Sequence, residues 1–169
     1  MAEIAQCLKL LVDFKVDFIV VGGVAVSARG SSYVSFDLDV CYSRDPSNLL
    51  RLAQALRSVN ATLRGAPRGL PFQLDAETLQ RGLNFTFDTD IGSLDLLGEV
   101  QGVGGYGECL EGSSTFELFG NTCGVLSLKK LIAAKRSAGR TKDLLVLPEL
   151  EAILEQHERG NTDKSQANE

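Results

Sequence analysis

The sequence has few residues from which to build a zinc site or a disulfide framework. It contains four cysteines and a single histidine, His157, in 169 residues. The cysteines are widely spaced and form no C-x-x-C pair: Cys7, Cys41, Cys109 and Cys123. Zinc sites need closely grouped ligands, and disulfide frameworks need a denser set of cysteines than this. We therefore expect four reduced, buried thiols.

Long apolar runs are also absent. No stretch approaches the roughly 20 apolar residues that a helix needs to cross a bilayer. The chain begins Met-Ala-Glu, without the basic head of a signal peptide. The sequence therefore predicts a cytoplasmic protein with no membrane partner.

A basic excess is missing as well, because the formal net charge is −5. General affinity for a nucleic-acid backbone depends on clustered lysines and arginines, so the overall charge argues against it. The charges are unevenly placed, however. Residues 129–142 hold six basic side chains and no acid, which leaves a local cationic patch: Lys129, Lys130, Lys135, Arg136, Arg140 and Lys142.

The 44% hydrophobic content and the length are those of one globular domain. Apolar residues at helical spacing predict helices over 2–14, 46–60 and 127–139, and a further helix from about 142 that Pro148 breaks or restarts. We place a single domain at 1–158. The polar residues 159–169 have nothing to bury, so we expect a disordered tail there.

Strand patterns fall between these helices. The candidates are Phe18–Val21, the run that carries Asp37 and Asp39, 83–87, 93–97, and a hairpin over 115–126 that turns at Gly120-Asn121. Segments 64–71 and 102–107 are rich in glycine or proline, and we interpret both as loops.

The anomaly in this pattern is the pair Asp37 and Asp39. Side chains alternate along a strand, so two acids one residue apart point the same way while their apolar neighbours point the other way. Like charges side by side repel each other and are costly to bury unless a cation lies between them. Carboxylate oxygens, with water and phosphate oxygens, are the ligands that Mg²⁺ prefers. The pair therefore predicts a divalent metal site.

Gly22 and Gly23 follow the first predicted strand. Glycine lets the backbone turn sharply and lets a ligand approach closely, because no Cβ is in the way. Backbone N–H groups at the start of the helix that we expect over Val24 to Arg29 would face an anion. The glycine pair therefore predicts a phosphate-binding turn.

These two motifs lie thirteen residues apart in FIVVGGVAVSARGSSYVSFDLDVCY, residues 18–42. The arrangement resembles the signature of the DNA polymerase beta-like nucleotidyltransferase superfamily. In that superfamily the glycine turn holds the nucleotide phosphates and the paired carboxylates hold the metals. The resemblance implies a third carboxylate on a neighbouring strand, and Asp95, which lies between leucines, matches it. Asp88 and Asp90 are the alternatives, although acids are common in turns for local reasons.

Residues 125–150, VLSLKKLIAAKRSAGRTKDLLVLPEL, resemble the C-terminal helical segment of small bacterial nucleotidyltransferase-like proteins. These lie near the AbiEii-type abortive-infection toxins and the minimal nucleotidyltransferase antitoxins. The resemblance places Lys135 and Lys142 beside the site as nucleotide-binding residues. That group often has an arginine where this chain has Tyr33, and threonine is common where it has Ser35. We assign Ser35 to nucleotide binding, and Arg29 is a substitute for the missing arginine.

The resemblance implies an α/β fold, with a mixed β-sheet, flanking helices and a short C-terminal helical segment. It implies transfer of a nucleoside monophosphate from a nucleoside triphosphate to a hydroxyl. Asp37 and Asp39 would bind two Mg²⁺ or Mn²⁺ ions, and Asp95 would complete the second metal site and accept the proton of the acceptor. Gly22 and Gly23 would hold the triphosphate.

The acceptor stays open between transfer RNA, a protein and a small molecule. The alternative function is a non-catalytic nucleotide- or partner-binding module of a toxin-antitoxin pair, with a toxin or antitoxin protein as its partner.

Overall fold

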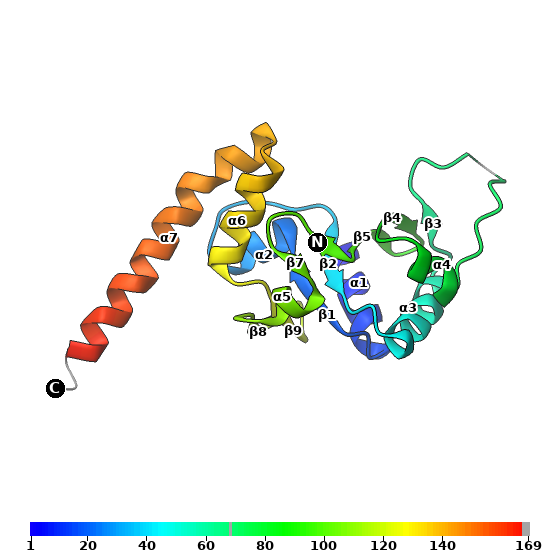
Figure 1. Cartoon of the computed structure of the whole chain (residues 1–169), viewed down its shortest axis with the longest axis horizontal. Helices are drawn as coiled ribbons and strands as arrows, with labels where there is room; N and C mark the ends of the chain where they lie inside the picture. The colour runs from blue at the N-terminus through cyan, green and yellow to red at the C-terminus, as the bar shows by residue number, and fades with distance from the viewer. Residues whose placement is uncertain (68, 167–169) are drawn as a thin grey trace.

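A seven-stranded mixed sheet organises the chain (Figure 1). The structure, a computed structural model, describes residues 1–67 and 69–166. The strands of the sheet are β1 (Phe18–Val21), β2 (Leu38–Tyr42), β3 (Thr62–Leu63), β4 (Asn84–Thr89), β5 (Gly92–Leu97), β8 (Ser114–Leu118) and β9 (Asn121–Val125). A separate short pair consists of β6 (Glu99–Val100) and β7 (Gly104–Gly105).

The strand order is β3-β4-β5-β2-β1-β9-β8, so β2 lies at the centre of the sheet. It runs antiparallel to β1 and parallel to β5, while β1 runs parallel to β9. The remaining neighbours are antiparallel: β3 with β4, across the segment that holds α4, and the two hairpins β4–β5 and β8–β9, of which the second is the predicted one. The predicted α/β fold with a mixed sheet is therefore confirmed.

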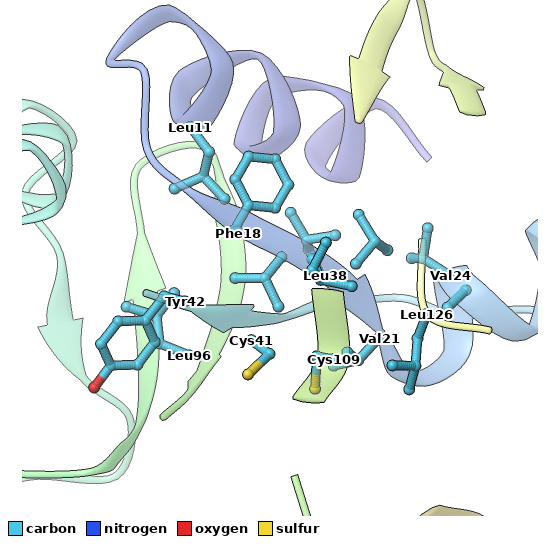
Figure 2. Close-up of a cluster of buried hydrophobic side chains, with 14 of the residues drawn as sticks. Leu11, Phe18, Val21, Val24, Leu38, Cys41, Tyr42, Leu96, Cys109 and Leu126 are labelled. Atoms are coloured by element: carbon cyan, nitrogen blue, oxygen red, sulfur yellow. The ribbon is translucent and has the colours of Figure 1, made fainter. Parts of the chain in front are cut away.

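Seven helices flank the sheet in the described part of the chain. They are α1 (Ala2–Asp13), α2 (Gly22–Ala28), α3 (Pro46–Ser58), α4 (Ala76–Arg81), α5 (Tyr106–Leu110), α6 (Leu128–Ala138) and α7 (Thr141–Gln166). Helix α1 packs on β5, β9 and β2, and α5 packs on β1 and β2. Figure 2 shows Leu11 of α1 above the central strands, with Cys41 and Cys109 below them. All four cysteines are buried and unpaired, as the sequence predicts.

Two short helices lie where the sequence gives no such indication. Helix α4 follows the loop at 64–71, and Asp75 caps it by accepting a hydrogen bond from the Thr78 N–H. Residues 102–107 are not a plain loop, because β7 and the start of α5 lie there. No described helix is both long enough and apolar enough to cross a membrane.

The C-terminal helices follow the predicted caps. Ser127 accepts a hydrogen bond from the Lys130 N–H at the start of α6, and Gly139 ends it in the left-handed conformation at φ 62°. The next helix differs from expectation, because α7 runs through Pro148 without a break. A proline inside a helix costs one backbone hydrogen bond. Burial of Val146 and Leu150 beside α6 offsets that cost.

The expected disordered tail also differs in the structure, because α7 continues to Gln166. An existing helix extends at little cost, since each added residue gains one hydrogen bond without a new nucleus. An ion pair between Arg159 and Glu155, one helical turn apart, supports the extension. The distal half of α7 projects away from the sheet (Figure 1). Residues 167–169 of the expected tail lie outside the described residues.

Candidate active site

One pocket of about 400 Å³ contains every side chain and glycine that the sequence assigns to the site. It is lined by Gly22, Gly23, Ser35, Asp37, Asp39, Asp95, Lys135 and Lys142, among others. These residues come from four parts of the chain: the β1–α2 turn, β2 with the segment before it, β5, and the α6–α7 joint. Their roles remain predictions, but the structure brings them together.

Asp39 and Asp95 are direct neighbours across the sheet. Strands β2 and β5 run parallel, and their register pairs Asp39 with Asp95. Leu38, Val40, Leu94 and Leu96 flank the two acids along the strands and are fully buried. Alternation along each strand therefore turns the acids toward the pocket and the leucines and valine into the core.

Asp37 lies just before β2, which begins at Leu38, and not within the strand as the sequence predicts. The strand ladder with β1 ends at the pair of Val21 with Asp39, so Asp37 has no partner strand on that side. A local contact holds it instead. The Ser35 hydroxyl donates to the Asp37 carbonyl at 3.0 Å and lies 3.4 Å from its Oδ1. Ser35 therefore helps to position Asp37 at the edge of the pocket.

Gly22 and Gly23 leave space for protein side chains of the site, and not only for a ligand. Gly22 has φ +62°, and a Cβ there would lie 2.2 Å from Asp39 Oδ2. A Cβ on Gly23 would lie 2.7 Å from the Ser35 hydroxyl oxygen. The Gly23 N–H also donates a hydrogen bond to Asp39. Any larger residue at Gly22 or Gly23 would therefore displace Asp39 or Ser35.

Burial raises the pKa of Asp39 to about 7, and the charges of Asp95 and Asp37 act in the same direction. Lys135 and the Gly23 N–H oppose the rise. Burial also raises the pKa of Asp95, against the effect of the Arg64 guanidinium. The carboxylates therefore repel each other at neutral pH, as the sequence predicts for closely spaced acids.

These acids fit a divalent cation that is completed by phosphate oxygens. Asp95 Oδ1 is buried without a hydrogen-bond partner, although Arg64 Nη2 lies 2.9 Å away as an ion pair. Within residues 1–67 and 69–166, no three His, Cys, Asp or Glu side chains are grouped tightly enough to hold a metal by themselves. Mg²⁺ in phosphate-binding sites is usually held by one or two carboxylates and by the phosphates of the substrate. Asp39 and Asp95 would supply these carboxylates, with Asp37 beside them.

The opposite wall is cationic and is built around Asp143, which is fully buried. Lys135 Nζ lies 2.7 Å from Asp143 Oδ1, and Arg140 Nε lies 2.5 Å from Oδ2. Burial alone would raise the pKa of Asp143, but the hydrogen bonds from Arg140 and Lys135 outweigh it and lower that pKa. Lys135 also lies 5.8 Å from the centre of the Tyr33 ring. Arg140, Asp143 and Tyr33 line the pocket, although the sequence assignment leaves them out.

The structure overturns one argument about the basic segment. The segment 129–142 itself contains no acid, but most of its cations are paired with acids from α7 or, for Lys130, with Glu111. The partners are Glu158 for Lys129, Glu111 for Lys130, Asp143 for Lys135 and Arg140, and Glu151 for Arg136. Lack of local partners in the sequence is therefore no sign of a ligand.

Arg29 does not substitute for the missing arginine. Its guanidinium donates to the carbonyls of Leu126 and Val125, at 3.0 and 2.9 Å, and lies 4.9 Å from the centre of the Phe116 ring. It holds α2 to β9 outside the pocket. The alternatives to Asp95 do not line the pocket: Asp88 pairs with Arg64, and Asp90 accepts a hydrogen bond from Asn60.

A further part of the pocket lies at the start of β4, at the end of β5 and along β6, and it was not apparent from the sequence. It is lined by Asn84, Leu97, Glu99, Val100 and Gln101. In contrast to the α6–α7 wall, this group contains no cation. These residues are dispersed among ordinary strand and turn patterns, so only their position in the folded chain marks them.

The sequence matches no protein-family model and no curated protein. Solved structures do match. A lincosamide antibiotic adenylyltransferase, LnuA, crystallised with lincomycin bound, is 16% identical, covers 89% of this chain and 96% of its own, and has a TM-score of 0.58. The antibiotic-resistance factor ANT(2'')-Ia is 11% identical, covers 98% of this chain and 95% of its own, and has a TM-score of 0.54.

This chain has the nucleotidyltransferase fold. The likeness covers 89% or more of this chain and 95% or more of each of the two solved chains. The likeness shows the fold, and membership of the expected superfamily stays a prediction. The narrower resemblance to minimal nucleotidyltransferases and AbiEii-type toxins stays a prediction.

Proposed function

We propose that this protein transfers a nucleoside monophosphate from a nucleoside triphosphate to a hydroxyl group of a small acceptor molecule. The observation that carries the proposal is the single pocket in which Asp37, Asp39 and Asp95 face a wall of Lys135, Arg140 and Lys142. Nucleotidyl transfer requires acidic residues that hold divalent cations and, on the facing side of the same pocket, basic residues that hold the phosphates. The fold shared with two proteins named for antibiotic modification or resistance supports the same reaction class.

The residues divide into two groups by charge. Asp39 and Asp95, with Asp37, would hold Mg²⁺ or Mn²⁺, which supplies charge neutralisation on the phosphates and an activated hydroxyl. Gly22 and Gly23 with Ser35 form the turn beside these acids, where the triphosphate fits. Lys135, Arg140 and Lys142 neutralise charge that develops on the leaving pyrophosphate. Asp95, which lies at the β5 side of the pocket, accepts the proton of the acceptor hydroxyl.

The part of the pocket beside β6, where we place the acceptor, favours a small hydroxyl compound over a nucleic acid. Asn84, Glu99 and Gln101 offer amide and carboxylate groups there, which suit hydroxyls or amines. A polyanionic RNA backbone would be repelled by Glu99 together with Asp95, and the net charge of the chain is −5. One structure with the same fold was solved with lincomycin bound, which is consistent with an acceptor of this size.

Incubation with each nucleoside triphosphate, labelled in the α-phosphate, and Mg²⁺ or Mn²⁺ tests the proposal. The acceptors are a panel of hydroxyl- and amine-bearing small molecules, total transfer RNA, and cell protein. We expect label on a small molecule with release of pyrophosphate, and a loss of at least about a hundredfold in Asp39→Asn. Label on RNA or protein would overturn the small-acceptor assignment. Metal-dependent binding without transfer to any acceptor would support the alternative, a non-catalytic module of a toxin-antitoxin pair.

A further inference from the structure

Arg64 approaches the acidic centre from outside the pocket. It follows β3 at the edge of the sheet, and its Nη2 lies 2.9 Å from Asp95 Oδ1. Arg64 itself does not line the pocket, whereas Asp95 does. Arg64 therefore reaches the pocket through its contact with Asp95.

The Arg64 side chain is held by two hydrogen bonds. Its Nε donates to Asp88 Oδ1 at 3.0 Å, and Nη2 donates to the Phe87 carbonyl at 3.1 Å. The Arg64 backbone N–H donates to the Thr86 carbonyl at 2.9 Å. Asp88 is fixed in turn by the Ser93 hydroxyl at 3.0 Å. A planar guanidinium fixed at two points has little freedom left, so its contact with Asp95 has a defined direction.

The contact between Arg64 and Asp95 involves one carboxylate oxygen of Asp95. Asp95 Oδ1 is buried, and it forms an ion pair with Arg64 Nη2 at 2.9 Å. The side chain of Asp95 is 17% exposed, and its register partner on the other side is Asp39. Arg64 therefore attracts one carboxylate oxygen toward β4, away from the like charge of Asp39.

We propose that Arg64 is a positioning residue for Asp95. Its fixed positive charge sets the orientation of the third carboxylate and competes with a divalent cation for it. This inference rests on the proposed function, in which Asp95 is the acid on the acceptor side. The purely structural alternative is that Arg64 only fastens the loop after β3 to β4 through Asp88.

The experiment compares Arg64→Gln and Arg64→Lys with the wild type. We expect Arg64→Gln to lower kcat by about tenfold to a hundredfold, because the reacting group is misplaced. The KM for the triphosphate should stay within about twofold, since the phosphate-binding wall is on the α6–α7 side. Arg64→Lys, which keeps the charge, should recover part of kcat. Arg57→Gln is the matched control: Arg57 tethers the same loop by donating to the Leu74 carbonyl, but contacts no acid of the site.

A second measurement is independent of turnover. Mn²⁺ binding, measured by calorimetry without nucleotide, should tighten by about threefold to tenfold in Arg64→Gln, because a repelling charge is removed. In an Asp95→Asn background the same substitution should change the Mn²⁺ Kd by less than about twofold, because the competing carboxylate is gone.

The outcomes separate the two ideas. Unchanged kcat in Arg64→Gln, or an equal change in Mn²⁺ Kd with and without Asp95, would overturn the positioning role. A loss of kcat and of melting temperature matched by Arg57→Gln would show that Arg64 only fastens the loop. Normal turnover in Asp95→Asn would instead refute the three-acid centre of the proposed function itself.

Discussion

At the scale of single residues, Asp39 is constrained from several sides. It is half-buried, it lies beside Asp95 in the parallel register, and a Cβ on Gly22 would collide with it. Its raised pKa means that the folded chain binds a proton there that the unfolded chain has released between pH 4 and 7. When it is ionised, such a carboxylate destabilises the fold in the absence of a cation, and it is a good ligand for a cation that binds there.

Stability in the presence of a chelator should fall as pH rises through this range. A pKa raised from 3.8 in the unfolded chain to about 7 in the fold favours folding at low pH and costs up to about 4 kcal/mol at higher pH. Asp39→Asn should remove this slope and exceed the wild type in melting temperature at pH 8. Thermal melts at several pH values check it, with the exposed Asp13→Asn as control. A wild-type curve parallel to that of Asp39→Asn would contradict the buried charge.

At the scale of secondary structure, the joint between α6 and α7 carries the cationic side of the site. Gly139 ends α6 in the left-handed conformation, and α7 begins at Thr141, so Lys142 and Asp143 return beside Lys135. Helix α7 is linked in turn to the segment before β2. Glu149 accepts hydrogen bonds from the Ser31 hydroxyl, at 2.6 Å, and from the Ser32 N–H, at 2.9 Å. The two charged walls of the pocket are therefore physically connected.

Replacing the lysines of this joint should weaken nucleotide binding. We expect Lys135→Ala and Lys142→Ala each to lower triphosphate affinity by about 1 to 3 kcal/mol, as for loss of a charge-assisted contact. Titration with a fluorescent triphosphate analogue measures it. Lys129→Ala, in the same helix but paired with Glu158 outside the pocket, should bind normally. Unchanged affinity in both pocket variants would leave Lys135 as a partner of Asp143 only.

At the scale of the whole molecule, the order of strands assembles the site. Strand β2 lies between β1, which leads into the glycine turn, and β5, which carries Asp95. Helices α6 and α7 close the pocket from the C-terminal end of the chain. The residues of the two charged walls are therefore distant in sequence, and a ligand that bridged them would stabilise the fold by mass action.

Metal and triphosphate should stabilise the protein together. Each ligand completes the coordination of the other, and binding only to the folded state raises the melting temperature by mass action. We expect a larger shift with Mg²⁺ and a triphosphate than the sum of the two separate shifts. Asp37→Asn should lose the metal-dependent part of the shift in melting temperature and keep any shift that the triphosphate causes alone. Equal shifts with and without Mg²⁺ would indicate an ordinary anion site.

Much of this arrangement was determined by the sequence itself, because its signals are local. Acids at alternate positions beside a strand, a glycine pair after a buried strand, Ser127 as a cap and Gly139 as a stop each depend on a few adjacent residues. Only the tertiary structure decided which distant groups meet. The register of β2 with β5, the pairing of Arg64 with Asp95, and the use of Arg29 against β9 depend on strand order. The passage of α7 through Pro148 has the same origin, since packing on α6 outweighs a local helix-breaking preference.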